Sequence, residues 1–381
     1  IPERRAGKPQ FRRHAAVRRT VSTHDSDGGR VLFVGGTRFV GRHGVEAFHE
    51  AGYEVTVFSR ERSGNPFAGR DGIHHVQGDR TERSDLERAR AAAASAGPSD
   101  STDATSTTDT ETVGTDTDGA PDIVIDTCAY HPRAVRTAVD VFADSRYVYV
   151  SSGSAYAPDD AIPMREDETP LEPCDEEAET DDSPETYGAR KAEGDRVVFD
   201  AAADGVEAMS VRPMLVVGPH DYTERFGYWV GRVAAYDRVL VPGDGGSLLH
   251  RTYVRDLADA LVTVAEEGDP GEAYNVADRT AYTLDRSLEI AADGLDTDVE
   301  VVHASARELA AHDVTPEQFP LYAPVPALAA TEKLAALGWD STDPEEAVAE
   351  TARRNYEADL TDPEGALDRA TEERVLDELA D

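Results

Sequence analysis

The 381-residue sequence predicts an α/β protein with a doubly wound parallel sheet and a smaller C-terminal lobe. Short apolar runs of β-forming residues alternate with helical patterns between residues 30 and 217. This alternation is typical of a parallel sheet covered by helices on both faces, and right-handed crossovers favour a doubly wound order. The first apolar run also leads into a glycine-rich turn and a helical pattern, which is how dinucleotide-binding sheets begin.

Each element is predicted from its apolar period and from the residues at its ends. The predicted strands lie at 31–34, 53–58, 73–76, 123–126, 147–150 and 209–212, with an exit at 215–217, and later at 273–276 and 299–302. The predicted helices lie at 39–51, 81–96, 135–143, 184–203, 226–236 and 254–267. Gly52 stands where the end of a helix favours glycine.

The same pattern divides the chain. Residues 30–219, completed by part of 250–277, are expected to form a Rossmann-type dinucleotide-binding domain, and 220–249 with 278–381 a substrate-binding lobe. Residues 1–29 are arginine-rich and lack the apolar stretch of an export signal, so we expect a disordered extension. Residues 97–121 are rich in Ser, Thr and Asp, which predicts a disordered insertion.

Acidic residues dominate the composition, with 76 Asp and Glu against 38 Lys and Arg and a net charge of −38. Lysine occurs only at Lys8, Lys191 and Lys333. Such a chain is typical of a halophilic protein, because high salt screens the repulsion among its charges; an ordinary acidic protein is the alternative. The charge opposes nucleic acid as the main partner. Residues 166–185 hold eleven acids and no base, which predicts a solvated lid or rim.

Three further observations narrow the class of protein. No apolar run reaches the length of a membrane span. The two cysteines, Cys128 and Cys174, do not make a disulfide framework or a metal-finger spacing. The acids of 166–185 lack metal-ligand spacing and no histidine lies among them, so we expect no metal. These features predict a cytoplasmic protein without membrane partners.

The segment RVLFVGGTRFVG predicts the pyrophosphate site of a dinucleotide. Gly35 suits the tight turn, and Gly41 suits close packing of the helix. The backbone N–H groups at the helix start would hold the phosphates. Arg38 replaces the middle glycine of the usual spacing, so it either points outward or supplies a cation to the cofactor. The candidate residues of this loop are Gly35, Gly36, Thr37, Arg38, Phe39, Val40 and Gly41.

The end of the second strand favours NADP over NAD. Ser59 and Arg60 stand where an acid would bind the ribose 2′-hydroxyl, and an arginine suits a 2′-phosphate. Asp79 is placed to accept from the adenine amino group, or else it caps a helix that begins at Thr81. The remaining candidate cofactor-binding residues are Arg80, Ser151, Pro213, Tyr187 and Lys191.

The catalytic candidates are Ser152, Tyr187 and Lys191. Residues four apart share a helix face, so the phenol and the ammonium of Y-G-A-R-K converge. The ammonium, together with an oxidised nicotinamide, would lower the pKa of Tyr187 and make it a general acid/base. Ser152 would bind the substrate oxygen, or else cap local backbone. Because Arg replaces Lys almost everywhere, a lysine retained beside Arg190 indicates chemistry that arginine cannot perform.

Together these residues resemble the extended and atypical short-chain dehydrogenase/reductases, the NAD-dependent epimerase/dehydratase family. The resemblance covers about Arg30 to the C-terminus. It extends to Ser151-Ser152 before Tyr156, Arg212-Pro213 with Gly218-Pro219, Tyr253-Val254-Arg255-Asp256-Leu257-Ala258, Ala273-Tyr274-Asn275-Val276 and Leu337-Gly338-Trp339. The GGTRFVG loop most resembles an atypical subgroup labelled isoflavone-reductase-like, sugar-epimerase-like or chloroplast stem-loop RNA-binding-like. The resemblance implies cofactor binding by the loop and proton transfer by the Ser, Tyr and Lys.

Two departures limit what the resemblance implies. Gly153 and Ser154 replace the Asp-Glu pair of the family's sugar dehydratases, so dehydration lacks its acid and base. The fourth strand ends in DTCAY, which leaves the nicotinamide-side contacts around 128–130 unassigned.

The first functional hypothesis is an NAD(P)-dependent epimerase, or a reductase, acting on a hydroxyl or keto carbon of a nucleotide-sugar or similar small molecule. The alternative is a non-catalytic dinucleotide- or RNA-binding protein. A homodimer is implied as possible by the resemblance. Five lobe residues either contact substrate or pack the lobe: Tyr222, Arg225, Tyr228, Trp229 and Arg251.

Overall fold

The computed structural model describes residues 29–60, 62, 64–96, 119–158, 162–358 and 362–380. The predicted disordered segments 1–29 and 97–121 therefore lie almost entirely outside the described residues.

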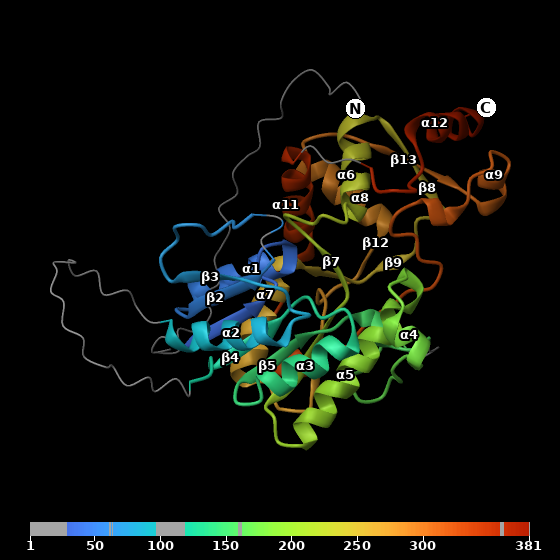
Figure 1. Ribbon diagram of the computed structural model, residues 1–381. Coiled ribbons are helices and arrows are strands. Elements are labelled where there is room, and N and C mark those ends of the chain that lie inside the picture. The colour runs from blue at the N-terminus through green and yellow to red at the C-terminus, as the bar shows by residue number, and fades with distance from the viewer. Residues whose placement is uncertain are drawn as a thin grey trace, which may run out of the picture.

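A seven-stranded parallel sheet forms the centre of the larger part of the molecule, in the order β11-β6-β5-β4-β1-β2-β3 (Figure 1). Its strands are β1 (Arg30–Val34), β2 (Glu54–Ser59), β3 (Ile73–Gln77), β4 (Ile123–Asp126), β5 (Arg146–Val150), β6 (Ala208–Pro213) and β11 (Ala273–Val276). The chain runs outward from β1 to β3 and then returns to β4 on the other side of β1. The predicted doubly wound fold is confirmed, and its order reverses between β1 and β4, where such sheets bind ligands beyond the strand ends.

Helices cover both faces of this sheet. Helices α1 (Phe39–Glu50) and α7 (Val254–Glu267) pack on one face, and α2 (Arg83–Ser95), α3 (Pro132–Val141) and α5 (Tyr187–Ala203) pack on the other. Along β1, Val31 and Phe33 face the first group, while Leu32 and Val34 face the second. All four are fully buried, because a parallel sheet with two covered faces has no solvated side.

A second hydrophobic core is built from the chain after residue 214, around Trp229, Leu240 and Leu288. Apart from α7 and β11, the helices and strands of this part of the chain are β7 (Leu215–Val217), α6 (Arg225–Ala235), β8 (Arg238–Pro242), β9 (Leu248–Leu249), β10 (Arg251–Tyr253), β12 (Tyr282–Thr283), α8 (Leu284–Gly294), β13 (Glu300–Ala304), α9 (Ala306–Ala310), α10 (Glu332–Ala336), α11 (Pro344–Glu357) and α12 (Arg369–Glu378). The predicted domain limits stay a prediction. The chain also returns to the sheet, since Leu334 and Trp339 pack in the core beside α1 and α7.

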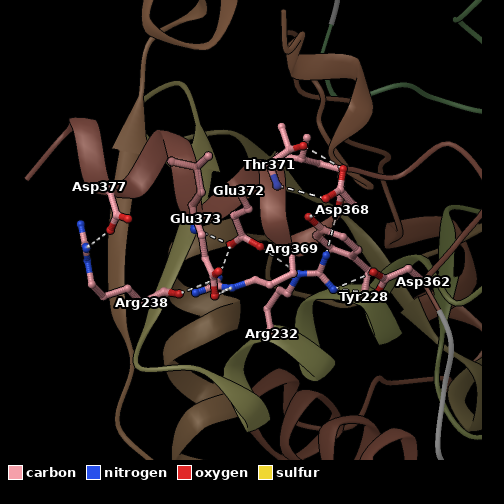
Figure 2. Close-up of polar contacts among 12 residues, drawn as sticks. Tyr228, Arg232, Arg238, Asp362, Asp368, Arg369, Thr371, Glu372, Glu373 and Asp377 are labelled. Atoms are coloured by element: carbon pink, nitrogen blue, oxygen red, sulfur yellow. Dashed lines mark hydrogen bonds and ion pairs between the residues drawn. The ribbon is translucent and has the colours of Figure 1, made fainter. Parts of the chain in front are cut away.

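Paired charges attach α12 to the lobe (Figure 2). Glu372 is fully buried and accepts hydrogen bonds from the Arg232 side chain and from the backbone N–H of Leu240. Arg232 also bonds both carboxylate oxygens of Asp362, at 2.7 and 2.9 Å. Arg369 forms ion pairs with Glu372 and Glu373. The arginines of this cluster thus have carboxylate partners, as buried charges require.

The acid-rich segment 166–185, predicted to be solvated, is a structured strap held against the sheet and against α3 and α5. It contains the short helix α4 (Glu176–Thr180). Arg136 of α3 bonds both carboxylate oxygens of Glu179. Glu166 is half-buried and accepts a hydrogen bond from the backbone N–H of Asn275, on the edge strand β11, at 2.8 Å. Seven of the eleven acids are exposed, which agrees with the predicted solvated rim. Composition does not reveal that Glu166 and Glu179 find a backbone or cationic donor.

Candidate active site

The glycine turn after β1 presses the start of α1 against the sheet. Gly35 has a φ of +97°, and a Cβ there would lie 2.8 Å from Thr127 Oγ1. A Cβ on Gly41 would lie 2.4 Å from the Gly35 carbonyl oxygen, and one on Gly36 would lie 2.8 Å from Val45. No side chain caps the N-terminus of α1. Its first N–H groups are therefore free to bind an anion, and the turn is shaped for close approach of a phosphate.

The side chains of this loop differ in their placement. Arg38 is exposed, and its guanidinium carbon lies 3.8 Å from the centre of the Tyr222 ring. Contact of this guanidinium with the cofactor stays a prediction. Phe39 is buried at the start of α1, whereas Thr37 and Val40 are partly exposed.

Near the end of β2, an arginine without a carboxylate partner stands beside polar groups. Arg60 is exposed and forms no ion pair among the described residues. Ser59 Oγ is 2.9 Å from His75 Nε2. Asp79 accepts hydrogen bonds from Thr81 N–H and Oγ–H, which lower the pKa of its carboxyl, and α2 begins later than predicted, at Arg83. Arg60 lies near enough to Asp79 to contribute to the lowered pKa of that carboxyl, but it forms no ion pair with it.

Arg80 does not present its side chain to the crevice. The guanidinium turns inward, 2.6 Å from the buried carboxylate of Asp126 and 2.9 Å from the carbonyl oxygen of Ala134. These bonds join the end of β3 to β4 and α3. This placement leaves the side chain of Arg80 occupied within the protein, and the prediction that Arg80 binds cofactor stays a prediction.

The structure brings Tyr187 and Lys191 together at the start of α5. Lys191 is buried, and its Nζ donates to the carbonyl oxygens of Ala129 and Val150, at 3.0 and 2.8 Å. Those carbonyls lie at the carboxyl ends of β4 and β5. The same Nζ lies 6.0 Å from the centre of the Tyr187 ring. The lysine therefore ties two strand ends together directly behind the phenol.

Of the two roles that the sequence left open for Ser152, the structure shows the capping one, since its Oγ accepts from the backbone N–H of Ser154 at 3.1 Å. The hydroxyl also lies beside Tyr187, and its hydrogen bond lowers the pKa of the phenol. Gly188 allows this approach, since a Cβ there would lie 2.3 Å from the Ser154 carbonyl oxygen. Binding of the substrate oxygen stays a prediction. Two other candidates are buried nearby: Ser151, whose Oγ has no partner among the described residues, and Pro213 at the end of β6.

Burial dominates the electrostatics of this pair. Desolvation raises the pKa of Tyr187, although the hydrogen bond from Ser152 and the nearby Arg225 lower it. Desolvation also lowers the pKa of Lys191, to about 8. The predicted lowering of the Tyr187 pKa is therefore not a property of the protein alone. The chain by itself keeps the phenol protonated and ready to donate.

Two residues that the sequence did not single out organise the site. Arg190 is buried and donates to the carbonyl oxygens of Tyr130 and Ser183, at 3.1 and 3.0 Å. It thereby joins the chain after β4 to the strap that precedes Tyr187. Tyr130 is 45% exposed and hydrogen-bonds Tyr222. The YGARK motif contained the only signal for Arg190, and we interpreted that arginine only as a contrast to Lys191.

The predicted substrate contacts separate into two groups. Tyr222 and Arg225 are exposed near Tyr187. Tyr228, Trp229 and Arg251 are almost fully buried, so these three pack the lobe. Within the described ranges, no group of His, Cys, Asp and Glu has the geometry of a metal site, and none of the helices has the length and apolar character needed to cross a bilayer.

The doubly wound sheet and the glycine turn before the uncapped helix α1 define a Rossmann-type α/β protein. Residues 31–277 match the model of the NAD dependent epimerase/dehydratase family. The match covers well over half of the chain, and the protein belongs to this family. The family resemblance drawn from the sequence is confirmed, while the GGTRFVG subgroup stays a prediction.

Individual relatives are distant. A chloroplast stem-loop binding protein of 41 kDa from Arabidopsis thaliana is 24% identical over 295 residues, which are 73% of this chain and 67% of that protein. A dTDP-glucose 4,6-dehydratase from Bacillus anthracis, solved with NAD, superposes with a TM-score of 0.64 at 18% identity, over 87% of this chain and 97% of that one. A UDP-N-acetylglucosamine 4-epimerase from Methanobrevibacter ruminantium superposes with a TM-score of 0.63 at 18% identity, over 87% of this chain and 99% of that one. These structural similarities concern the fold.

Proposed function

We propose that this protein is an NAD(P)-dependent epimerase or reductase acting on a hydroxyl or keto carbon of a nucleotide-sugar or similar small molecule. The observation that carries the proposal is the convergence of Ser152, Tyr187 and Lys191 at the crevice edge, beside the glycine turn. Family membership and the nucleotide-sugar enzymes among the structural neighbours support it.

The residues present fit a dinucleotide. The uncapped start of α1 suits the pyrophosphate, and a side chain on Gly35 or Gly41 would fill that place. Arg60 offers a free guanidinium at the end of β2, where no acid stands to accept from a ribose 2′-hydroxyl. This favours NADP over NAD. A bound nicotinamide would supply the hydride acceptor or donor.

The chain's own residues handle the proton. Tyr187 donates its phenol proton to a substrate carbonyl oxygen, or accepts one from a hydroxyl in the reverse direction. Ser152, bonded to Tyr187, holds the same oxygen in place. Lys191 fixes the strand ends behind the phenol and adds a positive charge that favours the phenolate. Arg225 lies near Tyr187 and Asp221 and donates to Thr223 Oγ1 at 3.1 Å, but it forms no ion pair among the described residues, so it suits an anionic group of the substrate.

The test is incubation of the purified protein with NADP⁺ or NAD⁺ and a panel of UDP-, GDP- and dTDP-sugars. A stoichiometric rise in reduced-nicotinamide absorbance identifies a dehydrogenase or reductase. A new sugar epimer without net absorbance change identifies an epimerase. Absence of both, in a protein that binds neither dinucleotide, would overturn the proposal.

The name of the Arabidopsis relative favours a second candidate, a non-catalytic stem-loop RNA-binding protein. The net charge of −38 opposes it. Binding of a stem-loop RNA that weakens steeply with salt, by protein beginning at Gly29, would support this candidate over the enzyme.

The proposal also covers the location of the protein in the cell, its oligomeric state and the division of its chain into domains. We place the protein in the cytoplasm, as a possible homodimer, with residues 30–219 and part of 250–277 binding the dinucleotide. Size-exclusion chromatography with light scattering tests the dimer.

A further inference from the structure

Tyr222 joins the two sides of the candidate crevice. On one side its ring lies under the guanidinium of Arg38, 3.8 Å from ring centre to Cζ, and meets Phe39 edge-on at 6.3 Å. On the other side its hydroxyl is hydrogen-bonded to Tyr130, which follows β4. Arg38 and Phe39 begin the helix expected to hold the pyrophosphate, whereas Tyr130 stands beside Lys191. A single side chain therefore spans from the phosphate end to the catalytic end.

The loop that carries Tyr222 is held in place independently of this contact. His43, buried in α1, donates from Nε2 to the carbonyl oxygen of Pro219 at 3.0 Å. His220 and Glu224 have φ values of +67° and +54°, in the left-handed region that side chains rarely adopt. Asp221 is buried and accepts from the N–H and hydroxyl of Thr223. Strained backbone of this kind persists where surrounding contacts define it, so the phenol is presented on a fixed support.

The far partner is also fixed. The carbonyl oxygen of Tyr130 accepts a hydrogen bond from Arg190 at 3.1 Å. The centre of the Tyr130 ring lies 5.4 Å from Lys191 Nζ. Tyr222 itself is 51% exposed. Tyr222 thus forms a bridge between two fixed edges of the crevice, Arg38 on one side and Tyr130 on the other. Only the Tyr222 ring has to move to open this bridge.

We propose that Tyr222 closes the crevice over the bound dinucleotide and sets the rate at which the dinucleotide leaves. The inference rests on the proposed function. A dinucleotide with its pyrophosphate at Gly35 and its nicotinamide at Tyr187 would run between the two edges that Tyr222 connects. Its departure would then break the stack on Arg38, the hydrogen bond to Tyr130, or both.

The experiment follows dinucleotide release from the full-length protein. Protein loaded with NADPH, and separately with NADH, is mixed with excess oxidised dinucleotide, and the decay of nicotinamide fluorescence gives the dissociation rate constant. We expect Tyr222→Ala to raise this constant at least about tenfold, because both contacts are lost. Tyr222→Phe keeps the stack and loses only the hydrogen bond, so about a threefold increase is expected.

Two further variants separate the bridge from general loosening. Tyr130→Phe removes the same hydrogen bond from its other end, and the double variant Tyr130→Phe/Tyr222→Phe should release no faster than either single variant. Tyr236 offers a matched control, because the guanidinium carbon of Arg369 lies 3.8 Å from the centre of its ring in the lobe. Tyr236→Ala should leave the dissociation constant unchanged.

The outcomes distinguish this inference from the function beneath it. If the parent protein binds NADPH or NADH and Tyr222→Ala releases it within twofold of the parent rate, the inference is wrong while the proposed function stands. If the parent protein binds neither dinucleotide, the proposed function fails and the inference fails with it.

Discussion

Arginine is used in opposite ways in two regions of this molecule. Around α12, Arg232 and Arg369 are neutralised by carboxylates, and the shared acid Glu372 is fully buried (Figure 2). Around the crevice, Arg38, Arg60 and Arg225 are exposed and form no ion pair among the described residues. Asp79 and Asp221 interact with Arg60 and Arg225 only through space, without an ion pair.

The difference shows what each region is built to do. A buried arginine needs its acid, because removing one partner leaves an uncompensated charge in the core. An arginine at a ligand site keeps its charge for the ligand, and a resident carboxylate would compete with phosphate for it. We therefore interpret the paired arginines of the lobe as structural and the unpaired arginines of the crevice as part of the proposed anion site. The predictions below test this assignment with matched substitutions in the two regions.

The largest expected effect is a loss of turnover that distinguishes Tyr187 in the crevice from Tyr228 in the lobe. Tyr187→Phe removes the proton that the proposed reaction transfers, so turnover should fall by about 10²–10⁴-fold while dinucleotide binding persists. Tyr228→Phe removes a buried hydroxyl that donates to the Leu367 carbonyl oxygen, which should cost about 1 kcal/mol of stability and leave turnover unchanged. Steady-state kinetics and denaturant unfolding measure both. Equal losses of turnover in the two variants would contradict the assignment.

The second prediction concerns the acid shared by the lobe arginines. Glu372→Ala leaves Arg232 buried without one of its two acids and orphans the N–H of Leu240, so unfolding free energy should fall by about 3–5 kcal/mol. The neighbouring Glu373→Ala removes only a surface pair with Arg369, worth about 0–1 kcal/mol. Urea unfolding with circular dichroism compares them. Similar urea midpoints for the Glu372→Ala and Glu373→Ala variants would show that the ion pairs of this cluster do not stabilise the fold.

Local patterns were sufficient to predict the sheet. The bounds of β4, α7 and β11 match the predicted ones, because buried parallel strands form short apolar runs and α7 has a clear helical period. The glycine turn was equally visible, since Gly35 and Gly41 occupy positions where a Cβ collides. These features depend on neighbours in the sequence, and a single chain displays them.

Features that depend on distant partners were missed. Strand β8 was not predicted, and its pairing is with β13, about sixty residues later in the chain. The orientation of Arg80 toward Asp126 depends on how β3 and α3 pack. The role of Arg190 depends on carbonyls of two separate loops. Composition also hid Glu166, since an acid in an acidic run gives no sign that a strand-edge N–H is its partner.

The third prediction removes an unpaired arginine. Arg60→Ala should raise the dissociation constant of NADPH about tenfold and leave that of NADH nearly unchanged, because only NADPH carries the 2′-phosphate. Its stability should stay within about 0.5 kcal/mol, as expected for an exposed side chain. Arg374→Ala, an exposed arginine of α12 without an ion pair among the described residues, is the control and should change neither. Equal weakening of both dinucleotides would count against NADP.

The smallest expected effect comes from Ser152, whose hydroxyl serves both backbone and phenol. Its hydrogen bond lowers the pKa of Tyr187 against the raising effect of burial, so Ser152→Ala should raise that pKa further. Alcohol oxidation needs the phenolate, which forms only as pH rises through the pKa. The limb on which the oxidation rate rises with pH should therefore move to higher pH. Ser154→Ala keeps its backbone N–H and should leave the profile in place. A profile that does not move in Ser152→Ala would mean that Tyr187 is not the group whose ionisation limits the reaction.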